Sequence, residues 1–255
     1  MNNMSPIDPD VLLIWEKQLK EREKELKKKE TQMGVFLHDL NHYIHVLSNS
    51  LHYYDSDSDF ERKEIIREEI IDYSHKIRHV ISAYQLFFHP KMLEHDIVCS
   101  RDVRAIISHI CSLYSRNASM KNISIHLIEE LKKEYIHKLG NYLDLAVAMV
   151  IDGAIKNAPN NTDFNISFFE DNECLTVEFK CWEICIDGED DYYSMEHEFG
   201  AGIIWNGTDK YIALTLFKQI CDSYNINYAF SKGDEKKVID DNNCQSSIVK
   251  LTFKK

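Results

Sequence analysis

The stretch MGVFLHDLNHYIHVLSNSLHYY, residues 33–54, decides the fold of this chain. Its apolar side chains recur at alternating steps of four and three residues, the heptad spacing of a packed helix. The stripe consists of Met33, Leu37, Leu40, Ile44, Leu47, Leu51 and Tyr54. Such a stripe lies along one face of a helix, and the helix is stable only when this face packs against other helices.

A second stripe with the same spacing follows the first. It consists of Ile66, Ile70, Tyr73, Ile77, Val80, Tyr84 and Phe87. The acidic turn 55–59 separates the two helices and can cap the second, which His89-Pro90 then ends. Two helices joined by a short turn form an antiparallel hairpin, and one hairpin cannot cover both stripes well. The pattern therefore predicts a homodimer in which two hairpins form a four-helix bundle, with the hairpin at residues 33–90.

The segment before the first stripe is charged. Leu12, Leu19, Leu26 and Met33 lie seven residues apart, but the alternate positions of this weak stripe are glutamates. Residues 1–32 are predicted to be a tail followed by a helical extension of the bundle helix.

Composition excludes several classes of protein. A net charge of −12 argues against a nucleic-acid partner, which would favour a basic surface. No apolar run reaches the roughly 20 residues of a membrane span, and the first residues do not resemble a signal peptide. The seven cysteines form no CxxC pair and are predicted to be reduced thiols. We therefore expect a cytoplasmic protein with neither a nucleic-acid nor a membrane partner.

Residues 100–255 combine helices with strands. Helices are predicted over 103–120, 141–157 and 210–224, and residues 182–207 are predicted to be irregular. The predicted strands are 123–128, 165–169, 175–179, 228–231 and 248–253. The predicted fold class is therefore α+β, a helical hairpin followed by an α/β sandwich.

The face beside the first stripe carries three histidines. His38 follows a stripe residue directly, and His42 and His45 lie on the same exposed face, four and seven residues further along. An exposed imidazole with an acid beside it, Asp39, suits transient chemistry on nitrogen. Histidines four residues apart can also share a transition metal. No acid or cysteine at ligand spacing accompanies them, so we predict no metal.

The tripeptide His38-Asp39-Leu40 at the start of a long amphipathic helix resembles the phosphoacceptor box of two-component histidine kinases. It is closer to their kinase-dead relatives, the histidine phosphotransferases of sporulation and cell-cycle phosphorelays. The resemblance implies that His38 accepts a phosphoryl group and that Asp39 fixes the tautomer of its ring. It also implies that receiver domains of response regulators dock below the histidine. The candidate docking residues are Asn41, His42, Tyr43, Ile44, His45, Leu47 and Ser48.

The resemblance continues to the C-terminus but fails at each nucleotide box. LAVAMVIDGAIK, residues 145–156, matches the N-box helix, yet Gly153 stands where the family has the asparagine that holds Mg²⁺. No Asp-x-Gly-x-Gly box follows Cys181. A single glycine, Gly207, remains of the last glycine-rich box. These departures imply a degenerate ATP-binding-like domain over 100–255 and no nucleotide cofactor. At the position of His42 the family often has Thr or Asn to orient water, so phosphatase activity is in doubt.

The sequence therefore predicts a protein that relays phosphoryl groups between receiver domains through His38 without ATP. Two alternatives stay open. One is a divergent but active sensor kinase, and the other is a non-catalytic dimeric adaptor that binds a response regulator.

Overall fold

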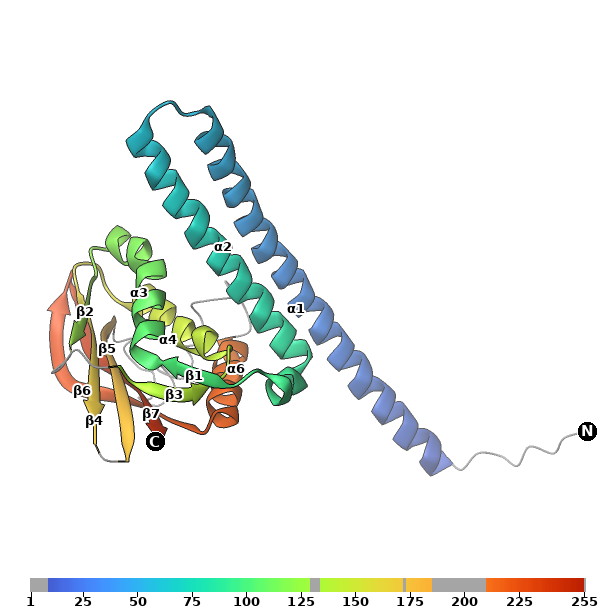
Figure 1. Ribbon diagram of the computed structural model, residues 1–255. Helices are drawn as coiled ribbons and strands as arrows, with labels where there is room; N and C mark the ends of the chain where they lie inside the picture. The colour runs from blue at the N-terminus through green and yellow to red at the C-terminus, as the bar shows by residue number, and fades with distance from the viewer. Residues whose placement is uncertain (1–8, 129–133, 172, 185–209, 255) are drawn as a thin grey trace, which may run out of the picture.

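The computed structural model describes residues 9–128, 134–171, 173–184 and 210–254 (Figure 1). Two long helices, α1 (Pro9–Ser56) and α2 (Phe60–Phe88), form the predicted antiparallel hairpin. The acidic turn acts as predicted: the Asp59 side chain accepts a hydrogen bond from the backbone N–H of Glu61 at 3.0 Å, while its own N–H donates to the Asp57 carboxylate at 2.9 Å. The first turn of α2 is thus capped by local side chains.

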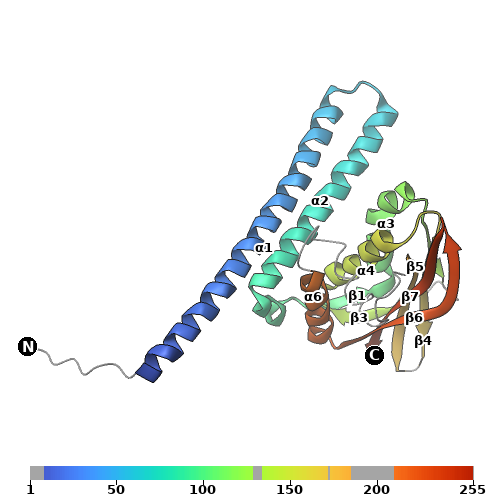
Figure 2. The same ribbon diagram turned by 180° about the vertical axis from the view of Figure 1, so that it is seen from behind.

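The predicted helical extension is part of α1. The N-terminal part of α1, which begins at Pro9, lies beyond the point where α2 ends (Figures 1 and 2). Because α1 runs without a break through residue 32, the predicted boundary there stays a prediction. Within the described residues, no helix combines the length and the apolar character needed to cross a membrane.

Helix α2 ends at Phe88, as the His89-Pro90 pair predicts, and the 3-10 helix η1 (Pro90–His95) leads into the second part of the chain. The elements of that part follow in order. They are β1 (Cys99–Asp102), α3 (Val103–Met120), β2 (Ser124–Ile128), β3 (Ile136–Leu139), α4 (Leu143–Asn157), β4 (Asp163–Glu170), β5 (Cys174–Ile184), α6 (Lys210–Ser223), β6 (Ile226–Ile239) and β7 (Asn242–Lys254).

The main sheet has the strand order β2-β4-β5-β7-β6, and α3, α4 and α6 cover the face turned toward the hairpin (Figure 1). Strands β2 and β4 run parallel, and the other neighbours run antiparallel. Alternate residues of β4 and β5, such as Phe164, Ile166, Val177 and Phe179, are buried against the helices. The predicted fold class, a helical hairpin followed by an α/β sandwich, is confirmed.

Several predicted elements need correction. The short strands β1 and β3, which pair with each other, were not predicted. Residues 182–184 continue β5 and are not irregular, whereas residues 185–209 lie outside the described part. Strands β6 and β7 are far longer than predicted and meet at Asp240 and Asp241, whose φ angles of 48° and 64° suit a tight hairpin turn.

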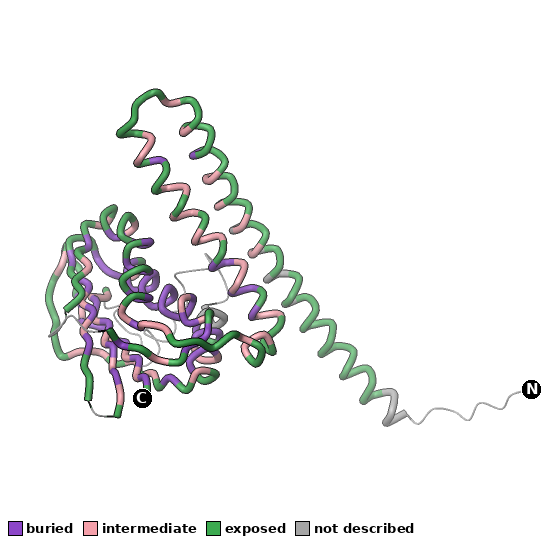
Figure 3. The backbone as a smooth tube through the Cα atoms, in the orientation of Figure 1, coloured by how far each residue is buried: buried purple, intermediate pink, exposed green. Residues whose placement is uncertain are grey.

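One hydrophobic core joins the hairpin to the sandwich. The end of α2 contributes Val80, Ala83, Tyr84 and Leu86, all at most 2% exposed, to the same cluster as Phe217 of α6 (Figure 3). By contrast, four positions of the first stripe are still 40–50% exposed. They are Met33, Leu37, Ile44 and Leu51.

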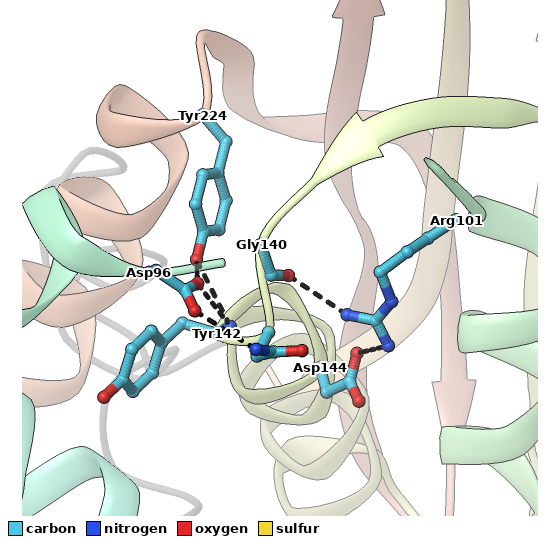
Figure 4. Close-up of polar contacts among 7 residues, drawn as sticks. Asp96, Arg101, Gly140, Tyr142, Asp144 and Tyr224 are labelled. Atoms are coloured by element: carbon cyan, nitrogen blue, oxygen red, sulfur yellow. Dashed lines mark hydrogen bonds and ion pairs between the residues drawn. The ribbon is translucent and has the colours of Figure 1, made fainter. Parts of the chain in front are cut away.

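A polar network fixes the linker after η1 to the start of α4 (Figure 4). The Asp96 carboxylate accepts hydrogen bonds from the Tyr224 hydroxyl, from the Tyr142 N–H at 3.4 Å and from the Asn141 amide at 3.2 Å. Burial, followed by the hydrogen bond to Asp96, raises the pKa of Tyr224 well above its ordinary value. Because Tyr142 gives α4 no side-chain cap of its own, Asp96 supplies an acceptor to this helix terminus from outside the helix.

Candidate functional site

The histidine face of α1 lies on the middle of the hairpin, where the helix is held by α2. His38, His42 and His45 are all exposed. Their position follows from the heptad spacing, because residues next to the stripe are turned away from the packed seam. The side chain of Asp39 lies outside the described residues, although its backbone continues the helix.

The candidate docking residues are divided between solvent and the hairpin interior. Asn41, His42, Ile44, His45 and Ser48 are exposed, and Leu47 is half-buried. Tyr43 is also half-buried and lies near Tyr73 of α2, with 6.2 Å between the ring centroids. An accessible surface therefore begins at His38 and continues for about three helical turns toward the loop of the hairpin.

The three histidines have different neighbours. The Nε2 atom of His45 lies 3.3 Å from the Asn49 amide nitrogen, while His42 faces α2, α3 and α4 across a small cavity. In the part of the chain that the structure describes, no group of three His, Cys, Asp or Glu side chains is arranged to hold a metal ion.

The segment that resembles the N-box forms α4, and its Gly153 is buried. The neighbouring Asp152 is 3% exposed, and its Oδ2 atom lies 2.8 Å from Lys156 Nζ. Burial raises the pKa of Asp152, an effect that the charges of Lys156 and Lys76 oppose. The carboxylate is thus balanced by lysines, and Gly153 offers no side-chain oxygen for a metal-bound nucleotide.

The other two nucleotide boxes fall largely outside the described residues. Of the segment after Cys181, Trp182 is described, and its ring lies under the Lys237 ammonium at 4.0 Å. Residues 185–188 and 207–209 are not described, and so the proposed loss of these boxes stays a prediction from the sequence.

Sequence reasoning missed a group of polar residues on α2. Lys76 and His79 lie beside the second stripe, and both face α3 and α4 rather than solvent. His79 is 3% exposed, and burial lowers its pKa to about 4. The sequence did contain a signal, because Lys76 and His79 directly precede the stripe residues Ile77 and Val80. A polar side chain beside a buried position needs a hydrogen-bond partner.

No protein-family model matches the sequence, and comparison with curated proteins finds no match either. Solved structures of histidine kinases do resemble the fold. The histidine kinase AdeS of Acinetobacter baumannii is 13% identical, with 84% of this chain and 96% of that chain covered and a TM-score of 0.46. A histidine kinase from Burkholderia phymatum is 14% identical, with 85% and 94% covered and a TM-score of 0.43.

Full-length ShkA, solved in complex with AMPPNP, is 9% identical to this chain. The match covers 87% of this chain and 45% of ShkA, with a TM-score of 0.49. At these identities the likeness concerns the arrangement of helices and strands and not the chemistry.

Proposed function

We propose that this chain is a histidine phosphotransferase that carries phosphoryl groups between the aspartates of receiver domains through His38, without using ATP. The observation that carries the proposal is the placement of the His38-Asp39-Leu40 box. Its histidine is exposed on a helix whose neighbouring residues pack against α2, so the imidazole is accessible while its backbone is held.

The proposed reaction uses the lone pair of one ring nitrogen of neutral His38. This nitrogen attacks the phosphorus of an aspartyl phosphate, an N–P bond forms, and the P–O bond to the receiver carboxylate breaks. The ring then carries a positive charge and one proton on its other nitrogen, where Asp39 would accept a hydrogen bond. In the second half, a carboxylate of another receiver attacks the phosphorus and the neutral imidazole leaves.

The arrangement of the exposed face favours a protein partner. Asn41, His45 and Ser48 present polar groups to solvent along one side of α1 below the histidine. A receiver domain docked here would bring its aspartyl phosphate to the imidazole. The lack of an oxygen ligand at Gly153 favours this source of phosphate over ATP.

The test supplies both sources of phosphate to the full chain. Incubated with phosphorylated receiver domains from its own cell, the protein should acquire an acid-labile, base-stable phosphoryl group, the signature of a phosphoramidate. With labelled Mg·ATP at millimolar concentration it should acquire none and show no heat of binding. Labelling by ATP would favour the sensor kinase, whereas a receiver that binds without transfer would favour the adaptor.

The exposed half of the first stripe predicts a dimer. Leu37, Ile44 and Leu51 of α1 are uncovered in one chain, as are Ile65 and Ile71 of α2, and monomers rarely leave apolar helix faces open. Sedimentation should give twice the 30.0 kDa mass of the chain at micromolar concentration. Leu40→Asp should dissociate the dimer because it would bury an unpaired charge, whereas Asn41→Asp on the exposed face should not. A monomeric wild-type chain would refute this architecture.

A further inference from the structure

A cavity of about 160 Å³ lies where the hairpin meets the sandwich, between α1, α2, α3 and α4. His42 and Tyr43 line it from α1, and Met120, which is 73% exposed, lies among its outer residues. Its polar walls come from the other three helices. They consist of Tyr73, Lys76, His79, Asn117, Asp152 and Lys156.

His79 is a buried polar group whose hydrogen bonds are not satisfied. Neither its Nδ1 nor its Nε2 atom has a hydrogen-bond partner among the described residues. A buried imidazole without partners costs free energy, and native structures rarely leave one in this state. Because His79 lines the cavity, a polar occupant of the cavity is the natural partner.

The charged side chains that line the cavity bear on the charge of the group that it could bind. Two ammonium groups, Lys76 from α2 and Lys156 from α4, line the cavity together with one carboxylate, Asp152, while Asp72 lies near Lys76 outside the lining. Burial lowers the pKa of Lys76, an effect that the carboxylates of Asp152 and Asp72 oppose.

The remaining polar groups are mainly donors. Lys76 donates a hydrogen bond to Asn117 Oδ1 at 3.0 Å, and the same amide, which lines the cavity, also carries an NH₂ donor. One ring nitrogen of neutral His79 carries a proton, and the Tyr73 hydroxyl also lies in the wall. Two ammonium groups and several neutral donors around one paired carboxylate favour an oxyanion and disfavour a metal ion.

We propose that this cavity binds a phosphate group, either inorganic phosphate or the terminal phosphate of a small monoester, held by Lys76, Lys156, His79 and Asn117. The site goes beyond the proposed relay, because none of these four side chains takes part in transfer at His38. A bound phosphate would connect α2 to α3 and α4, so it would stabilise the hairpin against the sandwich.

The test is titration of inorganic phosphate into the full-length protein, followed by calorimetry and thermal unfolding. One phosphate per chain should bind at millimolar concentration or tighter, raise Tm, and shift the ring-nitrogen NMR signals of His79. Lys76→Met and Lys156→Met should each weaken binding about tenfold or more. Lys236→Met, an exposed control on β6, should bind as the wild type does.

His79→Phe separates a ligand-binding role from a structural one. Removing an unsatisfied polar group should raise Tm without phosphate, while the phosphate-dependent rise in Tm should be lost. His38→Ala should bind phosphate normally, so failure of the relay and failure of this site are distinguishable. A control titration with AMP distinguishes the two sources: binding of AMP but not of free phosphate identifies a monoester site.

Two results would overturn the proposal. If neither ligand binds the wild type at millimolar concentration, the cavity holds only water. If phosphate binds all variants equally, it binds elsewhere on the surface.

Discussion

His38→Ala should abolish the acid-labile label, lowering the rate of phosphoryl transfer from a phosphorylated receiver by a factor on the order of 10³ or more. The substitution removes the nitrogen that would form the N–P bond, and no other group can replace it at that position. The label is measured by quenching timed samples and separating the two proteins. Because His38 is exposed, its removal should leave helix content, dimerisation and Tm unchanged.

The neighbouring residues provide matched controls for this experiment. Asp39→Ala should slow transfer by about tenfold to a hundredfold, because the acid orients and polarises the ring without forming the bond. His42→Ala and His45→Ala should keep the label. If the label persists in His38→Ala and disappears in His42→Ala, the accepting histidine is His42 and the assignment is wrong.

Asp96→Ala should destabilise the chain by about 1–3 kcal/mol, since the half-buried Tyr224 hydroxyl would lose its acceptor. The substitution removes the acceptor shared by the Tyr224 hydroxyl and the Tyr142 N–H, and that of the Asn141 amide. Urea unfolding measures the loss. Asp222→Ala, an exposed acid on α6, should change stability little.

Gly140→Ala tests the same network by adding a methyl group next to it. A Cβ atom at Gly140 would collide with the Asp96 carboxylate and the Tyr224 hydroxyl, so the hydrogen-bonded pair would have to separate. Overpacking of this kind costs about 1–3 kcal/mol. The double variant with Asp96→Ala should lose less than the sum of the two single losses, because the smaller side chain at position 96 makes room for the methyl group. Full additivity would contradict the proposed packing of the network.

The helices were predictable because their signals are local. Helix α3 occupies the predicted residues 103–120, and Asp102 caps it by accepting a hydrogen bond from the Arg104 N–H at 3.1 Å. The apolar spacing of α1 and α2 placed both helices and also the exposed histidine face, since that face is the complement of the stripe.

The strands that were missed depend on distant partners. Strands β1 and β3 have four residues each and no alternation of apolar and polar side chains, and they are brought together by pairing alone. The second half of β6 is rich in charged residues, such as Lys232, Lys236 and Lys237, a composition that is typical of a loop. Charged residues on an edge strand also discourage pairing with other chains.

The cavity between the hairpin and the sandwich could not be predicted for a related reason. Lys76 and Asp152 lie on helices far apart in the sequence, and they meet because α2 packs on α4. The sequence places each side chain on a helix face, but the docking of one helix on another decides which faces meet.

The shared core at the end of α2 couples the hairpin to the sandwich. Val80, Tyr84 and Leu86 are shielded from water within the cluster that also holds Phe217. Exposing a buried side chain of this size to water costs about 1.5–3 kcal/mol. We therefore expect this core to restrict motion of the sandwich relative to the hairpin.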